Sequence, residues 1–350
     1  MIRIFRAGLE RIPAYVPTSL EGITLDLRDN VNLWGAPPAA LAAARALGPD
    51  ALTQYPPVSA SGLTEVIAAR IGVATDEVVA GCGSDDLIDA CFRAVAAPGE
   101  RVAHAEPSFS MVPRFARLNG LEPIGVPLLA GGAIDVDGML ATGARIMYVC
   151  SPNNPTGTVT PEAEIRRLIA HAPGVVVVDE AYAEFASGRD WRAEAPAMER
   201  VLVLRTFSKA WGLAGLRVGY GIGSRTLIDA VVRSRGPYKV NAVADRAATV
   251  AMRDDREWMH RTAAAARAAR ERLDACVHDR PGIRAFASEG NFVFWQVEGD
   301  AQAFAARFAV AGIAVRAFSN LPGIGEALRI GVAPWDQLQR LVPLIEECWP

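Results

Sequence analysis

The sequence predicts an α/β protein with a large domain, in which a mostly parallel sheet lies between helices, and a smaller α+β domain. Between about residues 70 and 225, short uninterrupted apolar runs alternate with helical patterns. Such runs are typical of strands buried on both faces, and their alternation with helices favours parallel pairing. At 350 residues the chain also exceeds one small core. We expect a large domain at residues 31–250 and a small domain formed by residues 1–30 and 251–350.

The individual elements follow from local patterns along the chain. The Ala-rich segment 37–46 is expected to be a helix, and a second helix at 85–97 has an apolar face that includes Leu87, Ile88 and Phe92. A third, long helix is expected at 255–276, where Ala and Arg recur with helical periodicity. Strands are expected at 78–80, 145–150, 175–178, 201–204, 291–295 and 327–332.

Composition and charge exclude several classes of protein. The net charge is −3, without long runs of one sign, which argues against a nucleic-acid-binding protein or one held on an anionic membrane. No apolar stretch reaches the roughly 18 residues of a membrane-spanning helix. The five cysteines are scattered and odd in number, and the four histidines lack metal-ligand spacing. These features predict a cytoplasmic protein with reduced thiols, no signal peptide and no bound metal.

Polar residues collect where the expected strands of the large sheet end. In open α/β sheets, ligands bind beyond the carboxyl ends of the strands. Taken singly, these segments have ordinary explanations: Gly81 and Gly83 could open a dinucleotide motif, although Asp86 occupies its third glycine position, and Asp179 could cap a helix. Together they predict a binding site. The segments are Gly83-Ser84-Asp85, Asn153-Asn154-Pro155-Thr156-Gly157, Asp179-Glu180-Ala181-Tyr182 and Thr206-Phe207-Ser208-Lys209.

Lysine is rare in this chain. Only Lys209 and Lys239 occur among the 36 basic side chains. Arginine replaces lysine as a surface charge, but a guanidinium cannot lose its proton and an ammonium can. Imine formation with a carbonyl needs a neutral amine, so we expect Lys209 to be a nucleophile and Lys239 to be an ordinary lysine.

These segments resemble those of the fold type I, pyridoxal-phosphate-dependent class I and II aminotransferases. The similarity extends from Pro13-Ala14-Tyr15-Val16-Pro17 to Leu328-Arg329-Ile330. Within this family the chain is most similar to the histidinol-phosphate aminotransferases. The resemblance implies pyridoxal 5'-phosphate as cofactor and a role in amino-acid or histidine biosynthesis. The expected substrates are histidinol phosphate or another amino donor and a 2-oxo acid such as 2-oxoglutarate.

The resemblance also assigns cofactor contacts. Lys209 matches the lysine that binds the cofactor covalently and moves the proton, and Asp179 matches the partner of the ring nitrogen. A cation beside Asp179 also makes physical sense, because an isolated buried carboxylate is costly. Asn154 and Tyr182 match the groups that bind the phenolic oxygen, and Phe109 matches the ring-stacking aromatic. The expected phosphate ligands are Gly83, Ser84, Asp85, Thr206, Ser208 and Arg217, with Tyr55 contributed by the other subunit of a homodimer with shared active sites.

For the substrate, the resemblance implies that Arg329 holds the α-carboxylate and that Arg316 lies near a distal phosphate. Tyr15 and Asn291 are expected in the same pocket. The chain departs from the family pattern at 29–35, where glutamate is missing from the usual Asn-Glu-Asn-Pro and Trp34 replaces the following aromatic, and at Lys239, which replaces an asparagine. Both segments lie where specificity is expected.

Four other functions are compared with the expected histidinol-phosphate aminotransferase. An aminotransferase with an aromatic or other donor and a phosphothreonine-type decarboxylase use the same cofactor as the first expectation. A regulatory protein with an aminotransferase-like domain needs a DNA-binding extension, for which a resemblance starting by about residue 11 leaves no room. A nucleotide-binding Rossmann protein does not account for Lys209.

Overall fold

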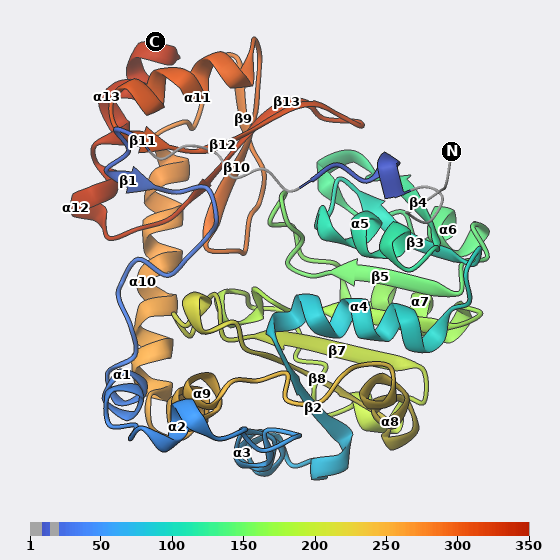
Figure 1. Ribbon diagram of the computed structural model, residues 1–350. Coiled ribbons are helices and arrows are strands. Elements are labelled where there is room, and N and C mark those ends of the chain that lie inside the picture. Colours follow the sequence, from blue (N-terminus) through green and yellow to red (C-terminus); the bar gives the residue numbers. More distant parts are fainter. Residues whose placement is uncertain (1–8, 15–20, 350) are drawn as a thin grey trace, which may run out of the picture.

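The computed structural model describes residues 9–14 and 21–349. Its largest sheet has seven strands in the order β2-β8-β7-β6-β5-β3-β4 (Figure 1). Strands from β7 to β4 pair in parallel, whereas β8 is antiparallel to both β2 and β7, so the mostly parallel sheet is confirmed. The strands are β2 Val78–Gly81, β3 Arg101–Glu106, β4 Glu122–Pro127, β5 Ile146–Cys150, β6 Val175–Asp179, β7 Val201–Thr206 and β8 Gly219–Gly223.

The central strands are buried on both faces because their successive side chains enter different cores. On β6, Val175 and Val177 join one apolar cluster, and Val176 and Val178 join another. β-branched side chains suit this pleated, fully covered position. The valine run is therefore the central strand that the sequence predicts.

Helices cover the sheet on both faces. α4 (Gly83–Val95), α5 (Met111–Leu118) and α8 (Arg225–Arg233) pack into the first cluster. Helices with side chains in the second cluster are α1 Pro38–Arg45, α3 Ser61–Ile71, α6 Val136–Ala141, α7 Glu162–His171, α9 Ala242–Asp254 and α10 Arg256–Ala275. The short α2 (Asp50–Thr53) lies between α1 and α3 in the chain.

A smaller antiparallel sheet has the order β12-β13-β10-β9. A third pairing joins β1 (Leu25–Asp26) in parallel to β11 (Ile313–Ala314). The smaller sheet consists of β9 Ile283–Ala285, β10 Phe292–Val297, β12 Arg316–Leu321 and β13 Gly325–Gly331. Its helices are α11 Ala301–Val310, α12 Trp335–Leu338 and α13 Leu341–Cys348.

Two segments connect the larger and smaller sheets. α10 runs from beside α9 to the smaller sheet, where it contacts β10 (Figure 1). The N-terminal segment leaves β1, passes β13 with a hydrogen bond from the Gly331 amide to the Leu27 carbonyl at 2.8 Å, and continues to α1. The N-terminal segment therefore runs from the smaller sheet to the helices that cover the larger one. No helix among residues 9–14 and 21–349 is long and apolar enough to cross a membrane.

Candidate active site

A cavity of about 440 Å³ lies between the carboxyl ends of the large-sheet strands and strands β12 and β13 of the smaller sheet. This is the position where open α/β sheets bind ligands. The sequence-predicted residues that line it are Ser84, Asp85, Phe109, Asn154, Asp179, Tyr182, Thr206, Ser208, Lys209, Arg217, Arg316 and Arg329.

Lys209 follows β7 and extends into this cavity. Its Nζ donates a hydrogen bond to the Asp29 carbonyl at 2.7 Å and lies 5.7 Å from the centre of the Tyr182 ring. Burial, and then the Arg329 guanidinium, lower the pKa of Lys209 from 10.5 to about 8. A substantial neutral fraction is therefore present near neutral pH, as a nucleophilic amine requires.

Asp179 ends β6 and is only 2% exposed. The Tyr148 hydroxyl donates to its Oδ2 at 2.6 Å, and the Ala181 amide donates to its Oδ1 at 3.0 Å. Burial raises the pKa of this carboxyl to about 6. Within the described part of the chain, no cationic side chain forms an ion pair with Asp179, so a cationic N–H of a ligand fits this position.

Tyr182 and Asn154 face the same cavity from neighbouring strand ends. Tyr182 is 3% exposed, and burial raises the pKa of its phenol. The Asn30 side-chain amide donates to the Tyr182 hydroxyl at 3.2 Å. Asn154 Oδ1 accepts a hydrogen bond from Arg329 Nη1. Both side chains can offer hydrogen bonds to an oxygen on a ligand.

The first turn of α4 forms an anion site with Arg217. The φ of Gly83 is +79°, and a Cβ at this position would lie 2.7 Å from Arg217 Nη2, so the close approach of the guanidinium requires glycine. Arg217 Nη1 lies 3.4 Å from Ser208 Oγ, and Arg217 Nη2 lies 3.4 Å from an oxygen of Asp85. A helix N-terminus, a guanidinium and a hydroxyl together suit a phosphate group.

The side of the cavity formed by the smaller sheet carries two arginines on adjacent strands. Arg316 of β12 is the cross-strand partner of Arg329 on β13. Arg329 is buried and donates to Asn154 Oδ1 and to the Arg28 carbonyl. The Arg316 side chain lines the cavity and makes no side-chain hydrogen bond or ion pair with another residue in 9–14 or 21–349. Its guanidinium is therefore available to an anionic ligand.

Some predicted residues lie elsewhere. Asn291 is buried behind the cavity, where its side chain donates to the Asn30 carbonyl at 2.9 Å. Tyr55 is 82% exposed and stacks on Tyr238 with ring centres 4.7 Å apart. Tyr15 lies outside the described residues. Lys239 forms an ion pair with Asp86 at 3.1 Å and is not part of the cavity wall.

The structure also adds residues that the sequence prediction missed. Phe318 could have been found, because it lies two positions after Arg316 on β12 and so shares its face. Asn30 was not predicted as a site residue, because the sequence marked its segment, 29–35, only as a departure from the family pattern. The further lining residues are Asp29, Ser108, Ser110, Met111 and Cys150, and Pro155 and Ala181 line the cavity within segments that the sequence predicts to form the site.

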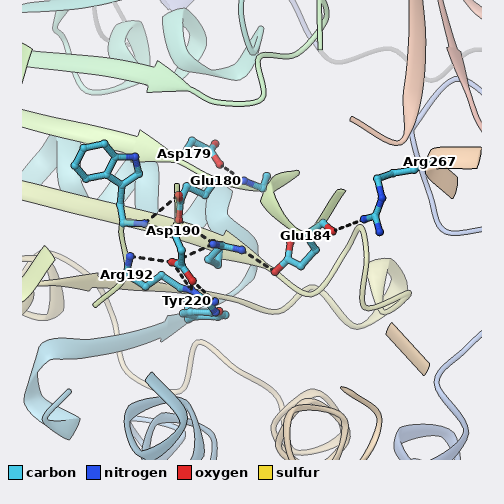
Figure 2. Close-up of polar contacts among 10 residues, drawn as sticks. Asp179, Glu180, Glu184, Asp190, Arg192, Tyr220 and Arg267 are labelled. Atoms are coloured by element: carbon cyan, nitrogen blue, oxygen red, sulfur yellow. Dashed lines mark hydrogen bonds and ion pairs between the residues drawn. The ribbon is translucent and has the colours of Figure 1, made fainter. Parts of the chain in front are cut away.

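A buried ionic network supports the turn that follows Asp179. Arg205 of β7 pairs with Glu180 at 2.9 Å, with Glu184 at 2.9 Å and with Asp190 at 3.2 Å. Figure 2 shows Glu180 and Asp190 close together below Asp179 in this view, and Arg267 of α10 donates to the Glu184 backbone carbonyl at 3.4 Å. Because Glu180 is the next residue after Asp179, this network fixes the turn that carries Asp179 and Tyr182.

Comparison with known proteins agrees with this geometry. Residues 23–344 match the family model of aminotransferases of class I and II. A histidinol-phosphate aminotransferase of Roseiflexus castenholzii is 36% identical, over 92% of this chain and 89% of that protein. An aromatic amino acid aminotransferase of Rhodococcus jostii is 35% identical, over 90% of this chain and 89% of that protein.

A solved structure shows the same fold. The crystal structure of histidinol-phosphate aminotransferase from Sinorhizobium meliloti in complex with pyridoxal-5'-phosphate has a TM-score of 0.91 at 24% identity, with 99% of each chain covered. The chain thus has the fold type I architecture. It belongs to the aminotransferase class I and II family.

The protein is accordingly a pyridoxal-phosphate-dependent transaminase. The cavity fits this cofactor on its own chemistry. It offers a buried carboxylate without a cationic partner among the described residues, a helix N-terminus beside Arg217 and Ser208, and an amine with a lowered pKa.

Proposed function

We propose that this enzyme transfers an amino group from histidinol phosphate to a 2-oxo acid such as 2-oxoglutarate. The observation that carries the proposal is the pair of guanidinium groups on adjacent strands, Arg316 opposite Arg329. Both line one cavity, and the Arg316 guanidinium has no ion-pair partner among the described residues. Two separated cations suit a substrate pair in which each member carries a distal anion.

The cofactor contacts of single residues are part of this proposal. Bound pyridoxal phosphate supplies an electron sink for the electrons released at the substrate carbon. Asp179 keeps the ring nitrogen protonated, Asn154 and Tyr182 bind the phenolic oxygen, and Phe109 packs on the ring. Lys209 holds the cofactor and then, as a free amine, moves the proton at the substrate carbon.

The anion contacts divide between the two ends of the cavity. The α4 N-terminus at Gly83, Ser84 and Asp85, together with Ser208 and Arg217, binds the cofactor phosphate. Thr206 supports this site, because its Oγ1 accepts the Ser208 amide at 3.0 Å. At the other end, Arg329 binds the α-carboxylate of the 2-oxo acid, a group that histidinol phosphate lacks, and Arg316 binds a distal anion.

An aromatic amino acid is the second candidate donor. It is favoured by Phe318 and Met111, which give the substrate end an apolar wall, and by the 35% identical Rhodococcus jostii relative. An aromatic donor would contact this wall and would leave Arg316 for the distal carboxylate of 2-oxoglutarate.

The donors are distinguished by comparing wild type with Arg316→Ala, using histidinol phosphate and histidinol, which differ only in the phosphate. If Arg316 binds the phosphate, the variant loses about 10- to 100-fold in kcat/KM with histidinol phosphate and little with histidinol. Phenylalanine serves as the aromatic donor in the same assay. A wild-type enzyme that prefers phenylalanine to histidinol phosphate contradicts the histidinol-phosphate assignment.

We also propose that the working unit is a cytoplasmic homodimer with shared sites. Tyr55 is not part of the described cavity wall, and Leu52 and Val58 near it in the sequence are strongly exposed. Exposed apolar side chains close together in a chain mark interaction surfaces. The five free cysteines suit a reducing compartment.

A further inference from the structure

Asn30 and Tyr182 form a buried contact between segments 152 residues apart in the chain. Asn30 lies between β1 and α1, is 2% exposed and lines the cavity. Its Nδ2 donates to the Tyr182 hydroxyl at 3.2 Å. An amide N–H can only donate, so the hydroxyl oxygen is the acceptor of this bond.

The Asn30 side chain is held in place by its own backbone. The Asn30 carbonyl accepts from the Asn291 side chain at 2.9 Å, and the preceding Asp29 carbonyl accepts from Lys209 at 2.7 Å. A Cβ at Gly331 would lie 2.9 Å from the Leu27 carbonyl, so β13 and this segment are in close contact. The φ of Asn30 is +53°, in the left-handed region that asparagine tolerates.

The direction of this hydrogen bond decides where the Tyr182 proton points. A hydroxyl has one proton, and in this geometry the bond with Asn30 does not use it. Within the described part of the chain, no protein acceptor takes the Tyr182 proton, and Tyr182 lines the cavity. The proton is therefore available to an oxygen of a ligand in the cavity.

We propose that Asn30 is a positioning residue that directs the Tyr182 hydroxyl toward the phenolic oxygen of the cofactor. This inference rests on the proposed cofactor contact of Tyr182. A reversed Asn30 amide would accept the Tyr182 proton and prevent that contact. The orientation of one amide thus controls whether Tyr182 acts as a donor in the site.

Asn30 Oδ1, the other polar atom of the amide, does not reach the open cavity. This oxygen is buried and has no hydrogen-bond partner in the described structure. The proposal therefore concerns only the Nδ2 side of the amide and its contact with Tyr182.

The proposal has a measurable consequence for the bound cofactor. A hydrogen bond from Tyr182 withdraws charge from the phenolic oxygen, and that oxygen then holds a nearby proton less strongly. The titratable and charged groups around Tyr182 are Arg329 on β13, Asp179 and Cys150 at strand ends, and Lys209 after β7. None of these four residues is substituted when only Asn30 is changed.

The test measures the pH at which the absorption of the bound cofactor changes, in Asn30→Ala and in Asn30→Asp. We expect this pH to rise by up to about one unit in Asn30→Ala. It should rise at least as much in Asn30→Asp, because a carboxylate takes the Tyr182 proton. The dissociation constant of the cofactor, measured by titration of the apoprotein, should rise about 2- to 10-fold in Asn30→Ala.

Two comparisons separate positioning from a general structural effect. In a Tyr182→Phe background, Asn30→Ala should cause no further shift. Asn32→Ala is the matched control, because Asn32 lies on the same segment but donates to the Ala210 carbonyl at 3.0 Å and is outside the cavity wall. Its absorption should match that of wild type.

An additional shift from Asn30→Ala in the Tyr182→Phe background, or no shift in the wild-type background, would overturn the proposal. A double-mutant cycle tests the Asn30–Tyr182 bond without cofactor. The melting temperatures of the apoproteins are compared for wild type, Asn30→Ala, Tyr182→Phe and the double variant, and we expect the two changes in melting temperature to be non-additive. Additive changes would also overturn it. If the wild type binds no cofactor, the proposed function fails, and the apoprotein cycle still decides whether the Asn30–Tyr182 bond exists.

Discussion

Two single residues in the cavity have pKa values displaced by burial in opposite directions. The pKa of Lys209 is lowered to about 8, and the pKa of Asp179 is raised to about 6. In both cases burial favours the neutral form. For Lys209 the neutral form is the nucleophile itself, whereas the Asp179 carboxylate needs a cationic ligand to offset its burial.

Asp179→Asn is predicted to change the pH dependence of apoprotein stability. The folded-state pKa of Asp179 lies above its ordinary value of 3.8, so the folded state binds the proton more tightly than the unfolded chain. The free energy of unfolding of the wild type therefore falls, relative to Asp179→Asn, as pH rises through about 4 to 6. Between pH 4.5 and 7.5 this difference should be roughly 2 kcal/mol in urea denaturation.

Asp274→Asn is the matched control for this measurement. Burial also raises the pKa of Asp274 to about 6, but this carboxylate accepts from Trp295 Nε1 at 2.8 Å, away from the described cavity wall. Its substitution should change stability with pH in the same sense and leave cofactor affinity unchanged. Equal loss of cofactor affinity in both variants would contradict the role of Asp179.

At the scale of elements, the patterns that rest on local chemistry predicted the structure well. The strands expected at 175–178 and 201–204 are β6 and β7, and the helix expected at 255–276 is α10. β8 was missed because Gly219, Gly221 and Gly223 alternate along it, and glycine is depleted in strands. A Cβ at Gly219 would lie 2.7 Å from the Ser84 amide, so the close approach of α4 requires this glycine.

The site residues that could be predicted from the sequence are those placed by the ends of predicted strands. Lys209 and Asp179 follow strands, so the sheet topology alone brings them together. Asn30 reaches Tyr182 only through the N-terminal segment, and no local pattern indicates a contact 152 residues away. The Arg205 network was missed for a related reason, since its acidic partners lie in a turn without periodicity.

Arg205→Leu is predicted to destabilise the turn after β6. The substitution leaves Glu180 and Glu184 buried without their cation, which typically costs about 3–5 kcal/mol. The comparison is Arg233→Leu, whose partner Asp229 lies at 2.9 Å on the exposed face of α8 and whose loss should cost less than about 1 kcal/mol. Urea denaturation measures both, and similar losses in the two variants would contradict the structural role of the network.

At the scale of the whole molecule, the two sheets enclose one site, but their division into domains remains a prediction. We propose the boundaries 31–250 for the large domain and 1–30 with 251–350 for the small one. α10 extends from α9 to β10 and so contacts both parts (Figure 1). Tyr55 is 82% exposed and is not part of the described cavity wall, and the proposed homodimer gives it a role in the site of the second copy.

Subunit exchange between Tyr55→Ala and Lys209→Ala is predicted to restore transaminase activity. If Tyr55 serves the partner's site, the mixed dimer has one site with both lesions and one intact site. Each variant alone should be impaired, and the mixture should recover up to about half of the activity per mixed dimer. Mass spectrometry demonstrates that the subunits have exchanged. If activity does not recover after this exchange, Tyr55 serves its own subunit.

The central claim, that Lys209 holds pyridoxal phosphate, is tested most directly by trapping the cofactor. The protein is loaded with pyridoxal phosphate, reduced with borohydride, digested and mapped by mass spectrometry. Lys239, ion-paired with Asp86 at 3.1 Å, is the internal comparison because it is the other lysine of the chain. We expect the reduced cofactor on the peptide that contains Lys209 and none on the peptide that contains Lys239. Label on Lys239, or an absence of label, would contradict the assignment of Lys209.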